Sequence, residues 1–125
     1  MIVNKVPKDF LGKVFWIQNQ IQFNHWIESN SGWQHEVLGD YYKEISANLD
    51  TLVESIAGTF GRQSLMINDE MYRIIDDMDN LSLANEINSI ILSFRKSFES
   101  ENGIINVIDE MLELNNSTIY KLGLR

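Results

Sequence analysis

The feature that most constrains this chain is a helical periodicity that runs through nearly all of it. Its only proline is Pro7, and proline is tolerated in the first turn of a helix. Beyond it, apolar residues recur at the 3.6-residue spacing of amphipathic helices. No segment shows the two-residue alternation of a competing strand. The sequence therefore predicts an all-α protein.

Four long helices are predicted, separated by short clusters rich in glycine, serine and asparagine. We expect them over residues 7–28, 33–58, 81–101 and 104–121. The first helix is expected to turn one face inward, formed by Leu11, Val14, Phe15 and Ile21 and continued by Gln18 and His25. Residues 64–79 are expected to be a connection that holds one short helix.

These lengths predict a four-helix bundle in a single domain over residues 1–125. The two short breaks pair the first helix with the second, and the third with the fourth, as hairpins. The long middle connection allows a crossover, as in ferritin-like bundles. An ordinary up-and-down bundle also fits the pattern.

Composition narrows the function. The chain has no cysteine, which excludes disulfides and thiolate metal sites. No stretch approaches the roughly 18 apolar residues of a membrane helix, and the first ten residues lack the apolar run of a secretion signal. We therefore expect a cytoplasmic protein. Its net charge of −8, without a basic patch, argues against DNA binding and suits metal cations.

The only two histidines, His25 and His35, flank the first predicted hairpin. A short turn between antiparallel helices brings such positions close together. Two converging imidazoles are half of a plausible metal site. The alternative is two unrelated histidines, one satisfied in the core and one solvated.

Two carboxylates of the second helix, Asp50 and Glu54, lie four residues apart on one helical face beside the apolar stripe. A cation is one partner that such carboxylates find, and solvation is the alternative. His35 and Asp50 are about 22 Å apart along one helix, so they cannot share an ion within one chain. Two antiparallel copies of this helix, related by a two-fold axis near Glu44, bring His35 of one chain to both carboxylates of the other.

The segments His25–Trp26 and GWQHEVLGDYYKEISANLDTLVESIAGTFG (32–61) resemble the ferroxidase signature of Dps miniferritins, over about 40 residues. In that family a His-Trp pair ends the first long helix and a second His opens the next. An Asp and a Glu follow that His at fifteen and nineteen residues. Here Asp50 and Glu54 follow His35 at those spacings.

The resemblance implies a ferritin-like fold and an inter-subunit iron site. His25 and His35 would come from one chain, Asp50 and Glu54 from its mate. Trp26 would lie beside the site, or would be an ordinary core aromatic at a helix end. Such a homodimer, extended to a shell of twelve chains, would oxidise ferrous iron (Fe2+ to Fe3+) with peroxide or oxygen and sequester it, protecting against oxidative damage.

The chain also departs from the family pattern. The loop between the histidines is two residues shorter, and Gly39 stands where an acidic residue is common, with Asp40 one place later. Ser55 replaces a frequent arginine, and the lysine-rich tail of some members is missing. These departures favour an alternative, a catalytically inactive ferritin-like structural or interaction protein.

An acidic cluster lies in the predicted connection, formed by Asp69, Glu70, Asp76, Asp77 and Asp79. We expect it to be a solvated face. The functional alternative is an entry path for cations.

Overall fold

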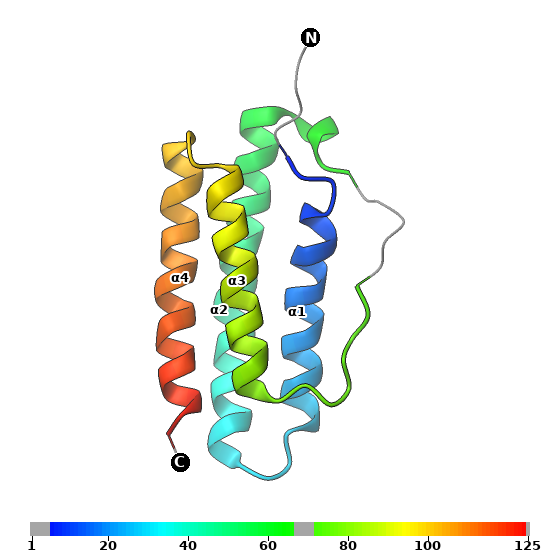
Figure 1. Cartoon of the computed structure of the whole chain (residues 1–125), viewed down its shortest axis with the longest axis vertical. Coiled ribbons are helices and arrows are strands. Elements are labelled where there is room, and N and C mark those ends of the chain that lie inside the picture. Colours follow the sequence, from blue (N-terminus) through cyan, green and yellow to red (C-terminus); the bar gives the residue numbers. More distant parts are fainter. Residues whose placement is uncertain (1–5, 67–71, 125) are drawn as a thin grey trace.

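The computed structural model describes residues 6–66 and 72–124. It contains the helices α1 (Phe10–Ile27), α2 (Gly32–Phe60), α3 (Asn80–Ser97) and α4 (Asn102–Leu122), with a 3-10 turn, η1 (Arg62–Ser64), after α2. The helices pack side by side as a bundle (Figure 1). The predicted all-α four-helix bundle is confirmed, and every helix end lies within four residues of its expected position.

The described end of the connection between α2 and α3, residues 72–79, runs along the part of α1 from Trp16 to Asn24. Backbone groups of Arg73, Ile75 and Met78 bond side chains of α1 in order towards the α1 C-terminus. The chain therefore returns to the end of the bundle where α2 began, and α3 runs in the same direction as α2 (Figure 1). The expected short helix is absent from the described part of this connection, whose one helical turn is η1 at its start.

Local sequence signals set several helix ends. The Ser31 hydroxyl accepts a hydrogen bond from the Gln34 N–H at 3.1 Å and caps α2. Gly61, with φ of 90°, ends α2 in a conformation that residues with a Cβ rarely adopt. The Asp79 carboxylate accepts from the Ser82 N–H at 2.8 Å and caps α3.

The core lies along the centre of the bundle and draws on all four helices. Phe10 of α1 meets Phe94 of α3 edge to face, with ring centroids 4.9 Å apart. The buried stripe of α2 recurs at helical spacing and consists of Val37, Leu38, Tyr41, Ile45, Leu49, Leu52 and Ile56. None of the described helices is both long and apolar enough to cross a membrane.

The inward face predicted for α1 was wrong in its phase. The buried residues are Phe10, Val14, Trp16, Ile17, Gln20, Ile21 and Asn24, and Phe15 is 51% exposed. The reason is that α1 is covered twice, by the bundle on one side and by the connection on the other. Apolar spacing alone does not show this second covering layer.

Candidate functional site

The two histidines meet at the α1–α2 hairpin. His25 lies in the last turn of α1 and His35 in the first turn of α2. Their rings stack with centroids 4.0 Å apart and planes inclined by 21°. The Nδ1 atom of each ring lies 2.8 Å from the backbone carbonyl oxygen of the other histidine. The hairpin thus brings the two rings together, as expected from their positions.

This reciprocal bonding defines the tautomer of both neutral rings. A carbonyl oxygen only accepts, so Nδ1 must carry the proton and donate it. In the neutral imidazole, Nε2 is then left with a free lone pair. Neither Nε2 bonds another described residue. A backbone carbonyl holding Nδ1–H is the arrangement that orients a histidine to bind a metal through Nε2.

Gly39 is explained by the packing of His25. A Cβ atom built on Gly39 would lie 2.9 Å from Cε1 of the His25 ring and 3.4 Å from both of its nitrogens. Real Cβ atoms do not approach ring carbons this closely. The glycine therefore makes room for the imidazole, and position 39 has a packing role.

Asp50 and Glu54 lie on the exposed side of α2, opposite its buried stripe. Neither makes an ion pair or hydrogen bond with a described residue. Because α2 is one unbroken helix, Asp50 lies about 22 Å along the axis from His35. Within one chain the histidine pair and the carboxylate pair are therefore separate.

Accordingly, no group of three or more His, Asp or Glu side chains suited to a metal ion occurs within residues 6–66 and 72–124 of the single chain. The hairpin brings the two histidines together, whereas the carboxylates lie farther along the same helix as His35. Only a second chain can bring the two halves together. The four-residue site thus stays a prediction about a dimer.

Trp26 is not a core aromatic, because 70% of its surface is exposed. It lines an open hollow of about 410 Å³ together with His25, Glu36 and Asp40, among others. The indole therefore lies beside the histidine pair, on the outer surface of the hairpin. Asp40 belongs to the same hollow but bonds no described residue.

The acidic residues of the connection have different surroundings. Asp69 and Glu70 lie outside the described residues. Asp76 and Asp77 are exposed. Asp79 caps α3, and the hydrogen bond from the Ser82 backbone N–H, followed by that from its hydroxyl, lowers the pKa of the Asp79 carboxyl. One member of the cluster is thus a structural cap.

Sequence reasoning missed the buried amides that hold the connection. Gln20, with 0% exposure, donates to the Ile75 carbonyl and accepts from the Ile75 N–H, both at 2.8 Å. Asn24 donates to the Met78 carbonyl at 2.9 Å. These side chains bond the connection as a neighbouring strand would. The available signal was the run of amide side chains in this helix, at Gln18, Asn19, Gln20, Gln22 and Asn24.

A second buried polar group joins α2, α3 and α4. The Tyr41 hydroxyl donates to the Asn115 side-chain oxygen, and Asn115 donates to the Ala84 carbonyl at 3.0 Å and to Asn88 at 3.2 Å. Burial raises the pKa of Tyr41, so its hydroxyl stays protonated and serves as a donor. This network specifies helix register.

The sequence was also compared with known proteins. No curated protein and no solved structure matches the chain. A protein-family model matches residues 25–122, which begin at the first histidine and include the whole α2–α4 region. Because the match covers more than three quarters of the sequence, the chain belongs to DUF5856, a family of unknown function.

Proposed function

We propose that this protein is a Dps-like iron-binding ferroxidase with a ferritin-like fold and an active site shared between two subunits. The observation that carries the proposal is the histidine pair. Both Nδ1 atoms are held by backbone carbonyls at 2.8 Å, which leaves both Nε2 lone pairs without a partner among the described residues. The crossover between the parallel helices α2 and α3 supports a ferritin-like arrangement.

The carboxylate half of the site is supplied by the second subunit. Two α2 helices packed antiparallel about a two-fold axis bring His35 of one chain beside Asp50 and Glu54 of the other. The axis then passes between Lys43 and Glu44, which are both exposed. Lys43 lies on the same side of α2 as Asp50 and Glu54, so it can pair with an acidic residue of the second copy across the axis.

Ferrous iron is the substrate of this site. Imidazole nitrogens and carboxylate oxygens with open positions suit ferrous iron. Each of two ferrous ions gives one electron to a peroxide molecule, which takes up two protons and leaves as two water molecules. The anionic Asp50 and Glu54 stabilise the ferric product by charge.

The test is an anaerobic ferrous titration followed by peroxide, with absorbance of the ferric product as the readout. The wild type is compared with a His35→Ala, Asp50→Ala double variant and with a Glu113→Ala control, which removes an exposed α4 carboxylate. Stoichiometric oxidation by wild type and control, lost in the double variant, supports the proposal. Oxidation no faster than in buffer for all three would refute it.

The second candidate is a ferritin-like structural or interaction protein without catalysis. The observation that favours it is the same histidine pair, because His35 donates to the carbonyl of His25 in the last turn of α1. Such a carbonyl has no partner within its own helix, so the bond pins the hairpin. The glycine at position 39 also favours this second candidate. This candidate predicts that the wild type does not accelerate iron oxidation and that removal of the pair lowers the stability of the protein.

A further inference from the structure

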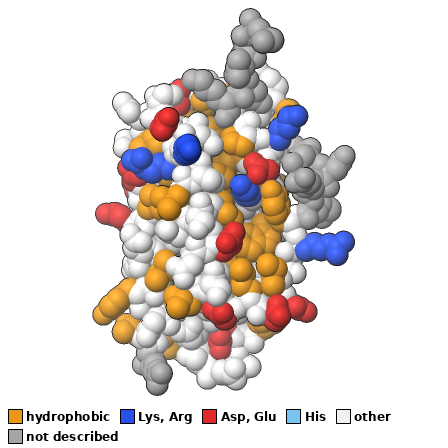
Figure 2. Space-filling view, viewed as in Figure 1, with side chains coloured by type: hydrophobic (Ala, Val, Ile, Leu, Met, Phe, Trp, Pro, Cys, Tyr) orange, Lys and Arg blue, Asp and Glu red, His pale blue; other side chains and the backbone are white. Residues whose placement is uncertain are grey.

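A pocket of about 530 Å³ opens on a different face of the molecule, between α1, residues 72–78 and α3. On this face hydrophobic side chains gather between α3 and α1 and are flanked by acidic and basic ones (Figure 2). The pocket lies apart from the histidines and from Asp50 and Glu54, none of which lines it. This volume lies within the range of pockets that bind small organic molecules.

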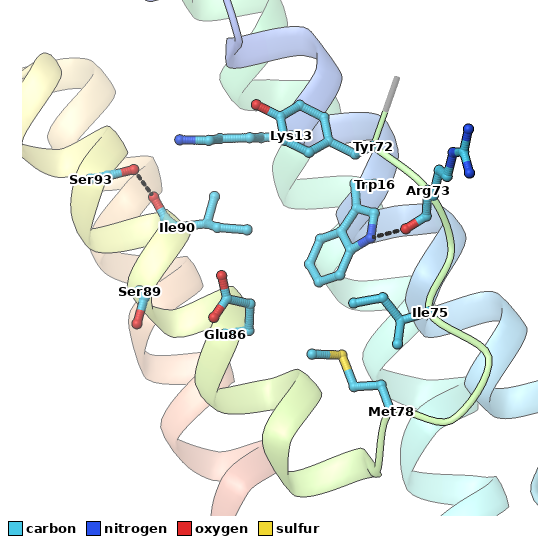
Figure 3. A pocket seen from close by; sticks show the side chains of 10 residues that line it. All are labelled: Lys13, Trp16, Tyr72, Arg73, Ile75, Met78, Glu86, Ser89, Ile90 and Ser93. Atoms are coloured by element: carbon cyan, nitrogen blue, oxygen red, sulfur yellow. Dashed lines mark hydrogen bonds between the residues drawn. The ribbon is translucent and has the colours of Figure 1, made fainter. Parts of the chain in front are cut away.

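The walls of the pocket are mainly apolar. Trp16 of α1, Ile75 and Met78 of the connection, and Ile90 of α3 converge on it (Figure 3). The Trp16 Nε1–H donates to the Arg73 carbonyl at 3.2 Å. The polar end of the indole is therefore satisfied, and the ring offers its carbon surface to a ligand.

Apart from Glu86 and Arg73, the charged and hydroxyl side chains of the described lining already have partners within the chain. Lys13 Nζ lies 3.0 Å from the Asp9 carboxylate, which balances its charge although two of its three N–H donors stay open. The Ser89 hydroxyl donates to the Asn85 carbonyl and the Ser93 hydroxyl to the Ile90 carbonyl. The two serine oxygens can therefore only accept a further hydrogen bond.

The carboxylate of Glu86 is the uncommitted charge. It points into the pocket (Figure 3), and it has no ion pair or hydrogen bond with a described residue. The Arg73 side chain instead points away from the cavity (Figure 3). The pocket thus combines an apolar surface with an unpaired anion and acceptor oxygens.

We propose that this pocket binds a small organic ammonium ion with an aromatic or branched apolar body. The ammonium group donates to Glu86, and the body packs against Trp16 and Ile90. An uncharged ligand of the same shape gains only the apolar contacts. An anionic one is repelled by Glu86 and by the net charge of −8.

Three probes of similar shape separate charge from apolar contact: phenethylammonium, the uncharged 2-phenylethanol and the anionic 3-phenylpropionate. Binding is followed at pH 7 by the fluorescence of Trp16 in a Trp26→Phe, Trp33→Phe background, where it is the sole tryptophan. We expect phenethylammonium to bind about fivefold more tightly than the alcohol, because the ion pair is partly exposed. The anion should bind most weakly. Equal affinity of ammonium and alcohol, or no response to either at millimolar concentration, overturns the proposal.

Two variants localise the site, and a third serves as their control. Glu86→Gln should lower ammonium affinity about fivefold and leave the alcohol unaffected, whereas Glu110→Gln, an exposed α4 carboxylate outside the pocket, should change neither. Ser89→Phe should fill the cavity and abolish binding of both. If the two glutamine variants have the same effect, or if Ser89→Phe folds and still binds, the proposal fails.

Discussion

His25 and His35 each hold the other's backbone, with Nδ1–H of one ring donated to the carbonyl oxygen of the other at 2.8 Å in both directions. This relationship has two consequences. It fastens the α1–α2 hairpin, and it gives both rings the tautomer whose Nε2 can bind a metal. The two consequences can be separated by mutation.

His35→Ala should lower both the free energy of unfolding and iron binding. The loss of stability should be about 1 kcal/mol, because one hydrogen bond to a helix-end carbonyl disappears. Asp50→Ala should abolish iron oxidation with no comparable loss of stability, since the Asp50 carboxylate bonds no described residue. Urea unfolding and ferrous titration of both variants check this. Unchanged stability of His35→Ala would contradict the structural role of the pair.

Gly39→Ala should destabilise the protein although alanine favours helix. The added Cβ would lie 2.9 Å from His25 Cε1, and displacing the ring should cost about 1–3 kcal/mol, more than the gain in helix propensity of about 1 kcal/mol. Gly58→Ala is the matched control in the same helix, because nothing lies within 4 Å of its added Cβ. It should stabilise by about 0.5–1 kcal/mol. Thermal unfolding of both variants measures these two changes in stability, which should have opposite signs.

Gln20→Met should release the connection from α1. The substitution keeps the length of the side chain but removes its bonds to the N–H and carbonyl of Ile75. The cost should be about 2–3 kcal/mol, since buried polar groups lose their partners. Amide hydrogen exchange should accelerate over residues 72–79. The Gln18 side chain makes no such bonds, so Gln18→Met should leave this exchange unchanged. Unaltered exchange at Ile75 would show that other contacts hold the connection.

Self-association through α2 should depend on divalent cations. The exposed side of α2 carries five carboxylates against one lysine, Lys43; they belong to Glu36, Asp40, Glu44, Asp50 and Glu54. Two such faces repel each other unless a cation binds between them. We expect sedimentation velocity to show a dimer with anaerobic ferrous iron and a monomer with chelator. Lys43→Glu should weaken the dimer, and a dimer that is indifferent to both treatments would argue against the proposed interface.

The stabilisation of α3 by its Asp79 cap should depend on pH. Hydrogen bonds from Ser82 hold the pKa of Asp79 below its ordinary value of 3.8. The stabilisation by the charged carboxylate is therefore complete above that ordinary value and is lost as the pH falls through the lower folded-state pKa. Asp79→Ala should cost about 1 kcal/mol at pH 7. Asp79→Asn should keep most of the cap without the pH dependence, which urea unfolding at pH 7 and pH 3 would test.

The fold was largely predictable from local pattern. The stripe from Leu38 to Ile56 and the turn at Ser31 identify α2 because helix periodicity and capping act within a few residues. The face of α1 was mispredicted, since the inward position of Gln20 depends on Ile75, fifty-five residues away. A polar residue is buried only where such a distant partner satisfies it.

By itself the sequence determined the helices, their hairpin pairing and the approach of His25 to His35. These follow from residue spacing and short turns, which are local properties. Only the tertiary structure decided the tautomer of the histidines, the need for glycine at position 39, and the alignment of Glu86 with the apolar wall of Trp16 and Ile90. Those properties arise where separate elements meet, because hydrogen-bond partners and packing contacts are set by distances in space and not by distances along the chain.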